Sequence, residues 1–265
     1  MKVYLSADIE GITGSTHWDE TDKKHSDFSE FREQMTAEVV AACEGALQAG
    51  ATEIWVKDAH DSARNLIAAR LPTQARLLRG WSGHPYQMVE GLDASFKALL
   101  MIGYHSRAGS DTNPLAHTMS GSAAYVKING LYASEFMINT YTASLENVPA
   151  VFVSGDAGLC VDAARLVPAL TCVAVKEGVG NGSINLHPHL AVEKIKAGVR
   201  DALEKNTALC HVPLPDHFNV EVRYKEHAPA YQHSFYPGAS LKEPHTIVFE
   251  TDRYFDVLRF FAYVF

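Results

Sequence analysis

Carboxylate and imidazole side chains recur directly after stretches of apolar sequence. They are Asp8 and Glu10 after residues 2–7, Asp58 and His60 after residues 52–57, His105 after residues 97–104, His117 in the polar stretch that follows, and Glu135 at the start of a helical pattern. Carboxylate oxygens and imidazole nitrogens bind Zn²⁺, Mn²⁺ and similar divalent ions. These residue types therefore indicate metal-assisted chemistry, provided that the fold brings them together.

The number of candidate ligands favours two ions over one. Asp8 and Glu10 are separated by one residue, so in an extended segment both carboxylates project to the same side. With one carboxylate bridging, the five groups Asp8, Glu10, His60, His105 and Glu135 can hold two ions about 3.5–4 Å apart, the spacing of two-metal hydrolases. Taken singly, each residue has a structural alternative, because a carboxylate can cap a loop and a histidine can bond a carbonyl. Convergence on one edge of a sheet is what distinguishes the two interpretations.

The elements that must position these residues alternate between strands and helices. Residues 2–7 and 52–57 are predicted strands, and residues 27–49 between them show the apolar spacing of a helix that ends at Gly50. This order indicates a parallel pair of strands with a right-handed crossover. Further strands are predicted over 97–104, 123–129, 150–154 and 171–176, and helices over 134–146 and 157–166. Ligands of such sheets bind outside the carboxyl ends of the strands, where the candidate residues fall.

The predicted fold class is α/β, a three-layer α/β/α arrangement with a mainly parallel sheet and a smaller C-terminal α+β lobe. The composition changes after Glu177, where GVGNGS (178–183) is rich in glycine and predicts a flexible segment or one packed closely on a ligand. We place the metal-binding catalytic core at 1–178 and the lobe at 179–265, with a helix over 189–205, strands near 218–224 and 245–250, and a helix near 252–263. Oligomer contacts and a lid over the site are the roles considered for this lobe.

Composition excludes several classes of protein. The 265 residues are 47% hydrophobic and 20% charged, which is typical of a globular chain and not of a disordered one. A formal net charge of −8 leaves no basic face for nucleic acid, and no apolar run is long enough to cross a membrane. The four cysteines are far apart and show no C-x-x-C spacing, so neither a disulfide framework nor a thiolate zinc site is expected. We therefore predict a cytoplasmic protein without nucleic acid or membrane partners.

Several motifs together resemble the zinc D-aminopeptidase family of the DppA type. They are SADIEG (6–11), KDAH (57–60), VEGLD (89–93), GYHSRAG (103–109), AHTMSG (116–121), ING with SEF (128–136) and SGDAG (154–158). The motifs occur in order along essentially the whole chain, and the similarity is best over residues 1–180. No single motif is specific, whereas the set is.

The resemblance implies an activity and a site. It implies a two-zinc centre held by Asp8, Glu10, His60, His105 and Glu135, with Asp8 as the bridge, and a catalytic histidine at His117. It also implies release of N-terminal D-amino acids, notably D-alanine, from short peptides by a ring-like homodecamer with an internal channel. The chain departs from the family pattern at Lys57, where asparagine is expected, and at Ala116 and Thr118, where serines are expected. These departures concern the choice of substrate more than metal binding.

Other functions stay open at this point. A different metallohydrolase on the same scaffold, such as an amidase or a phosphoesterase, would use the same ligands. A non-enzymatic protein that binds D-amino acids or dipeptides is the second alternative. For His117, the roles of nucleophile, general acid/base and support for a ligand are all compatible with an imidazole at neutral pH. The remaining histidines, including His84, are predicted to be structural or to lie on the surface.

Overall fold

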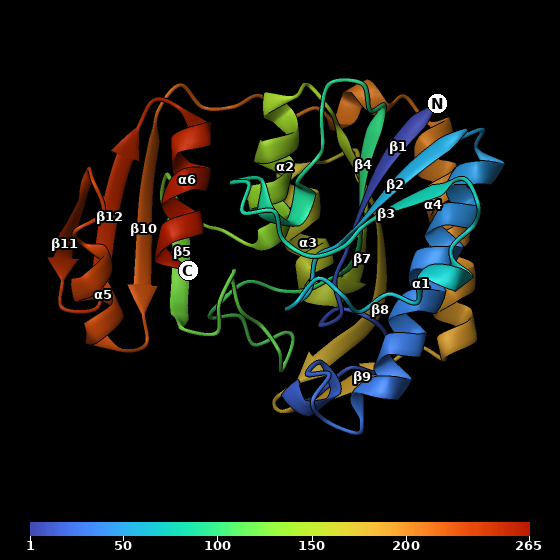
Figure 1. Cartoon of the computed structure of the whole chain (residues 1–265), viewed down its shortest axis with the longest axis horizontal. Coiled ribbons are helices and arrows are strands. Elements are labelled where there is room, and N and C mark those ends of the chain that lie inside the picture. The colour runs from blue at the N-terminus through green and yellow to red at the C-terminus, as the bar shows by residue number, and fades with distance from the viewer.

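A seven-stranded sheet forms the larger half of the molecule in the computed structural model, which describes residues 1–265 (Figure 1). Its strands are β1 (Lys2–Ala7), β2 (Glu53–Asp58), β3 (Ala75–Leu78), β4 (Ala98–Tyr104), β7 (Ala150–Asp156), β8 (Thr171–Val179) and β9 (Gly182–Asn185), in the order β3-β2-β1-β4-β7-β8-β9. Neighbours from β3 to β8 are parallel, and β9 pairs antiparallel with β8. Every residue of β4 and β7 is buried, as expected of parallel strands that are covered on both faces.

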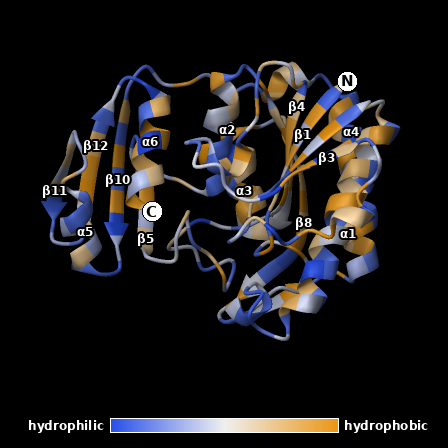
Figure 2. Cartoon of the chain, viewed as in Figure 1, coloured by the Kyte–Doolittle hydropathy of each residue, from blue (hydrophilic) through white to orange (hydrophobic).

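Helices cover both faces of this sheet, which confirms the predicted three layers. Helices α1 (Phe28–Gln48) and α4 (Pro188–Glu204) pack against each other on one face, and α2 (Glu135–Leu145) and α3 (Ala157–Leu166) lie on the other (Figure 1). The apolar strands between the helices stand out in Figure 2. Helix α2 begins after Ser134, whose Oγ accepts a hydrogen bond from the backbone N–H of Met137 at 3.2 Å. This cap fixes Glu135 at the first position of the helix.

A five-stranded antiparallel sheet forms the smaller half of the molecule. Its strands are β5 (Ala123–Ile128), β6 (Leu131–Tyr132), β10 (Phe218–Tyr224), β11 (Ala239–Glu243) and β12 (Thr246–Thr251), in the order β11-β12-β10-β5-β6. Helix α5 (His227–His233) and helix α6 (Tyr254–Val264) pack on this sheet, and α6 also contacts α2 of the larger half. The two halves have separate hydrophobic cores, and the second is rich in aromatic side chains such as Phe218, Tyr254 and Phe260.

The two sheets divide the chain differently from the boundary predicted at residue 178. Strands β5 and β6 belong to the antiparallel sheet because β5 pairs with β10, which lies far along the chain. Strand β9 and helix α4, which were assigned to the C-terminal lobe, complete the larger half. The glycine-rich segment 178–183 forms the hairpin between β8 and β9, in which Gly180 has a φ of +58°. Elements β3, β9, β11 and α5 were not predicted.

The order of the strands places the site. Strand β1 lies between β2 and β4. After β1 the chain continues to β2 on one side, whereas after β4 it continues to β7 on the opposite side. Such a switch point opens a crevice between the loops that follow the strands. The segments after β1, β2 and β4 therefore meet at one edge. None of the helices has the length and apolar composition of a membrane span.

Candidate metal centre

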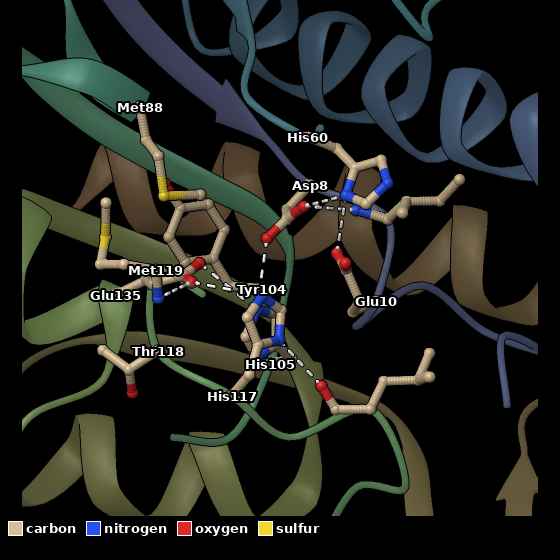
Figure 3. Close-up of polar contacts among 12 residues, drawn as sticks. Asp8, Glu10, His60, Met88, Tyr104, His105, His117, Thr118, Met119 and Glu135 are labelled. Carbon is tan, nitrogen blue, oxygen red and sulfur yellow. Dashed lines mark hydrogen bonds and ion pairs between the residues drawn. The ribbon is translucent and has the colours of Figure 1, made fainter. Parts of the chain in front are cut away.

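Six predicted site residues converge at the carboxyl ends of the parallel strands. Asp8 and Glu10 follow β1, His60 follows β2, His105 follows β4, Glu135 opens α2, and His117 comes from the loop between β4 and β5. All of these side chains are buried except His117, which is partly exposed. Figure 3 shows them pointing toward a common centre. The structure thus brings together residues that the sequence distributes over nearly half of the chain.

Asp8 lies between two pairs of side chains. Its Oδ1 is 3.4 Å from Nδ1 of His60, and its Oδ2 is 3.5 Å from Nε2 of His105. Glu10 Oε2 lies 3.1 Å from the same nitrogen of His60, and Glu135 Oε2 lies 3.3 Å from that of His105. Asp8 therefore joins a Glu10–His60 pair to a Glu135–His105 pair, which is the position of a bridging carboxylate.

Each of the three imidazoles is oriented by a backbone carbonyl. His60 Nε2 donates to the carbonyl of Thr21, His105 Nδ1 to that of Ser106, and His117 Nδ1 to that of Leu115, each at 2.9 Å. A carbonyl can only accept, so these contacts assign the ring proton to the nitrogen that faces away from the cluster. The other nitrogen of each ring faces the centre. This arrangement is typical of histidines that bind a metal ion.

His117 stacks on His105 and borders the open side of the cluster. The ring centroids are 4.2 Å apart with an interplanar angle of 12°, and His117 Nε2 lies 3.7 Å from Glu135 Oε1. Burial lowers the pKa of His117, and the neighbouring charge of His105 lowers it further. His117 therefore presents a neutral imidazole with a free Nε2 lone pair toward the site.

The three carboxylates create a strongly cation-attracting environment. Burial, together with the charge of Glu10, raises the pKa of Asp8 well above its usual value. Burial acts in the same direction on Glu10, but the charge of His60 outweighs it and holds the pKa of Glu10 well below its usual value. Burial opposes the charged form of both His60 and His105. The charge of Glu10 nevertheless raises the pKa of His60 well above its usual value, and the charge of Glu135 raises the pKa of His105 to about 10. Protons thus bind where a metal cation would bind.

Two buried polar atoms of the cluster have no hydrogen-bond partner. They are Oε2 of Glu10 and Nε2 of His105. An unsatisfied buried polar atom costs about 1–3 kcal/mol, so such atoms need an explanation. Donor atoms of Asp8, Glu10 and His105 lie within 4.8 Å of one another, and so do those of His105, His117 and Glu135. Oxygen and nitrogen donors at this spacing fit divalent metal ions, which would satisfy both atoms.

One predicted candidate has a different role, and several functional residues were missed. Asp58 is buried but accepts hydrogen bonds from the backbone of Asn65 and Leu66, so it shapes the loop after β2 instead of joining the cluster. Lys176 of β8 donates to the carbonyl of Ser15 at 2.6 Å and to that of Glu10. In the sequence Lys176 is an ordinary polar residue of a strand, and nothing there indicates the contact.

A cavity of about 710 Å³ opens from the cluster. Five of the six site residues line it, together with side chains that the sequence did not single out, such as Trp18, Trp81 and His84. Trp18 lies edge-on to His117, with the ring centroids 5.3 Å apart. His84, predicted to be structural or on the surface, is exposed and also borders the cavity. The fully buried Tyr104, in contrast, does not line the cavity but bonds Ser6.

The arrangement is shared with known proteins. A model of the D-aminopeptidase family (Peptidase_M55) matches residues 1–263. A D-aminopeptidase of Bacillus subtilis (strain 168) is 30% identical over 249 residues, which cover 94% of this chain and 90% of that protein. The solved structure of the Zn-dependent D-aminopeptidase DppA from Bacillus subtilis, described as a self-compartmentalizing protease, superposes with a TM-score of 0.94 at 27% identity and covers 100% of this chain and 96% of that one. Because the family match spans nearly every residue, the chain belongs to the D-aminopeptidase family of metallopeptidases.

Proposed function

We propose that this protein is a zinc-dependent aminopeptidase that releases the N-terminal residue of short peptides, in particular D-amino acids such as D-alanine. In this proposal Asp8, Glu10, His60, His105 and Glu135 would hold two zinc ions. The observation that carries the proposal is the convergence of buried carboxylates and imidazoles, in which Glu10 Oε2 and His105 Nε2 have charged neighbours but no hydrogen-bond partner. The relative whose structure superposes on this chain is described as zinc-dependent.

The chain's own groups define the two halves of the centre. Asp8 faces both histidines of the set, so it would be shared between the two ions, and Glu10 with His60 and Glu135 with His105 would hold one ion each. When bound, the ions supply a Lewis acid for the scissile carbonyl and lower the pKa of a water molecule. The backbone N–H of Met119 donates to Glu135 Oε1 at 2.7 Å and thereby orients the carboxylate that opens α2.

His117 is the catalytic residue of the proposal. Its Nδ1 proton is held by the Leu115 carbonyl, so only Nε2 can take or deliver a proton or attack a carbonyl carbon. Its lowered pKa keeps the ring neutral at physiological pH, which both roles require. The stacking on His105 keeps the reactive nitrogen beside Glu135 and next to the cavity.

The charge of the cavity favours a substrate with a free amine. Besides the carboxylates of the cluster, Asp61 lines the same cavity, no lysine or arginine does, and the charge of Glu90 is paired with that of Lys57. Asp61 lies outside the proposed zinc ligands, so its carboxylate remains available to an ammonium group of the substrate when the ions are bound. A substrate amine that docks at the acidic end places the first peptide bond next to His117, which makes the enzyme an exopeptidase.

Assembly and location complete the proposal. The helices that pack on the antiparallel sheet leave Tyr231 of α5, Phe235 just after it and Tyr263 of α6 more than half exposed, which is compatible with contacts between copies in a homodecamer. The relative described as self-compartmentalizing supports such a closed assembly. All four cysteines are free thiols, which fits a reducing cytoplasm.

A substrate panel tests the proposal against its alternatives. Zinc-loaded protein is incubated with D- and L-alanine amide, with D-alanyl dipeptides and with a phosphate monoester, and the products are quantified. Preferential release of D-alanine supports the proposal. Hydrolysis of the phosphate ester instead identifies a phosphoesterase. Stoichiometric binding of the D-amide without turnover, in protein that contains zinc, identifies a binding protein.

A further inference from the structure

The cavity reaches beyond the polar cluster to the loop that follows β3. Trp81 and His84 of this loop line it, and so do Met88 and Met119, whose side chains lie beside the cluster in Figure 3. Its volume of about 710 Å³ is within the range of roughly 300–1,000 Å³ of pockets that take small molecules. The cavity thus combines an acidic end, where Trp18 contacts His117, with an apolar wall to which Trp81, 43% exposed, contributes a large flat ring.

The indole of Trp81 is held from two directions. Its Nε1 donates to the carbonyl of Asp61 at 2.7 Å, and the ammonium of Lys57 lies 4.1 Å from the ring centroid. Lys57 also donates to the carbonyl of Gly80, and the N–H of Gly80 donates to Ala63 at 2.8 Å. The ring and the residue before it are therefore fixed by neighbours that do not belong to the metal cluster.

A buried ion pair anchors the loop on the other side of Trp81. Lys57 is fully buried, and its Nζ lies 3.2 Å from Oε1 of Glu90. The second oxygen of Glu90 accepts from the backbone N–H of Ser82 at 3.2 Å and from its Oγ at 2.9 Å. Buried ion pairs contribute little to stability on balance, but they impose a specific geometry when every atom has a partner. Here that geometry fixes residues 80–82.

The loop after β2, which accepts hydrogen bonds from Trp81 and Gly80, has a strained backbone. Asp61 and Ala63, which supply the two acceptor carbonyls, have φ angles of 44° and 52°. Residues other than glycine seldom adopt this left-handed region, and they tend to do so at functional sites where the surrounding structure enforces it. The carbonyls of these two residues accept from Trp81 and Gly80, so the strained loop and the buried ion pair both hold the segment that carries Trp81.

We propose that Trp81 is a specificity-determining residue that packs against an aromatic or large aliphatic side chain of the peptide. The inference rests on the proposed peptidase function and names its substrate class. An indole that is already immobilised loses little conformational freedom when a flat side chain stacks on it. The acidic end of the cavity orients the amine, and Trp81 selects the side chain. Lys57 and Glu90 act as positioning residues for Trp81.

Two substrate series test the role of Trp81. Amides of D-phenylalanine and D-alanine vary the released residue, and dipeptides of D-alanine followed by D-phenylalanine or D-alanine vary the next one. In Trp81→Ala we expect the ratio of kcat/KM for the phenylalanine substrate to that for the alanine substrate to fall about tenfold in one series, which identifies the residue that contacts Trp81. Trp81→Phe keeps a flat apolar ring and restores most of the ratio. A ratio within twofold of the wild type in both series overturns the proposal.

The positioning pair is tested by removing both charges. Lys57→Met with Glu90→Gln avoids leaving one ion unpaired and keeps an acceptor for Ser82. We expect the preference for the larger side chain to fall about threefold, through KM and not kcat, while the zinc content stays at the wild-type value. An unchanged KM ratio, in a variant whose loop folds as judged by a crystal structure, shows that the pair does not position Trp81.

Binding separates this inference from the proposed activity. In zinc-loaded His117→Ala protein, calorimetry measures the affinities of all four substrates without requiring turnover, with and without Trp81→Ala. A loss of preference for the larger side chain in one series supports the role of Trp81 even if the wild type hydrolyses none of these compounds, a result that would refute the peptidase alone. Equal losses for the phenylalanine and alanine substrates refute the role of Trp81 alone.

Discussion

The candidate metal centre consists of two halves that are supported in different ways. The first half is Asp8, Glu10 and His60, and the second half is His105, His117 and Glu135. Buried charged side chains support the first half. Lys176 donates to the carbonyl of Glu10, and Glu38 accepts from the backbone N–H of Thr13 in the same loop at 3.0 Å. The second half is oriented by uncharged groups, namely the carbonyls of Ser106 and Leu115, the N–H of Met119 and the N-cap Ser134.

This difference follows from the elements involved. His105 directly follows a fully buried strand and Glu135 opens a capped helix, so regular structure already fixes these two residues. Asp8 likewise follows a buried strand, and the backbone N–H groups of Asp8 and Gly11 donate to β4, but the loop that continues to residue 15 also depends on hydrogen bonds with side chains of other elements. We therefore expect the first half to respond to the loss of buried charges and to pH, and the second half to respond mainly to changes in its own ligands.

The largest effect is expected when a ligand of either half is removed. Glu10→Ala and His105→Ala should each lower the zinc content from two ions per chain to one or none, and hydrolysis of D-alanine amide should be lost with it. Elemental analysis after dialysis measures the stoichiometry. Glu44→Ala removes an exposed carboxylate of α1 and should keep both ions. Two ions per chain in Glu10→Ala or His105→Ala would refute the ligand set.

Within the second half, His117 should separate chemistry from metal binding. His117→Ala should lower kcat by about 10²–10⁴-fold, the usual contribution of a positioned acid or base, while the zinc content stays at two. Steady-state kinetics and elemental analysis on the same preparation measure both quantities. His25→Ala, at an exposed histidine, is the control and should change neither. Loss of zinc from His117→Ala would make this residue a ligand or the support of one.

The parts of the site that the sequence predicted are those set by local pattern. Asp8, Glu10 and His105 follow short apolar runs that favour strands, and Ser134 with Glu135 is a recognisable helix start. The carboxyl ends of parallel strands must meet, so convergence followed from the order of the elements. His117 lies in a loop without such constraints and was assigned by resemblance.

The parts that were missed depend on contacts between distant segments. Lys176 and Trp81 are adjacent to the site only because strands and loops far apart in sequence pack together, and no periodicity marks them. The pairing of β5 with β10 is of the same kind, which is why the predicted boundary at residue 178 does not match the two sheets. Asp58 has the same local context as the candidate ligands, and only its bonds to Asn65 and Leu66 show its different role.

Titration of Glu38, which supports the first half, should make the stability of the protein depend on pH. Burial raises the pKa of Glu38 from 4.5 to about 7, so between these values the folded state binds more protons than the unfolded state. Stability therefore falls as pH rises through this window, by up to about 3 kcal/mol. Urea unfolding of zinc-free wild type should show this loss, and Glu38→Gln, which keeps the acceptor oxygen, should lack it. Parallel curves for the two proteins would show that Glu38 does not titrate in this way.

The smallest expected effects compare the supports of the two halves directly. Lys176→Met removes the donor to the carbonyls of Glu10 and Ser15 and should weaken zinc binding about 10–100-fold, as changes behind metal ligands do. Ser134→Ala removes the helix cap beside Glu135 and should cost about 1 kcal/mol of stability, with zinc affinity changed less than about threefold. Chelator competition measures the affinities, and urea unfolding measures the stabilities. Helix α2 keeps its backbone hydrogen bonds without the cap, so only Lys176→Met should lose metal affinity. Equal losses of zinc affinity in Lys176→Met and Ser134→Ala would show that both halves depend on their supports to the same degree.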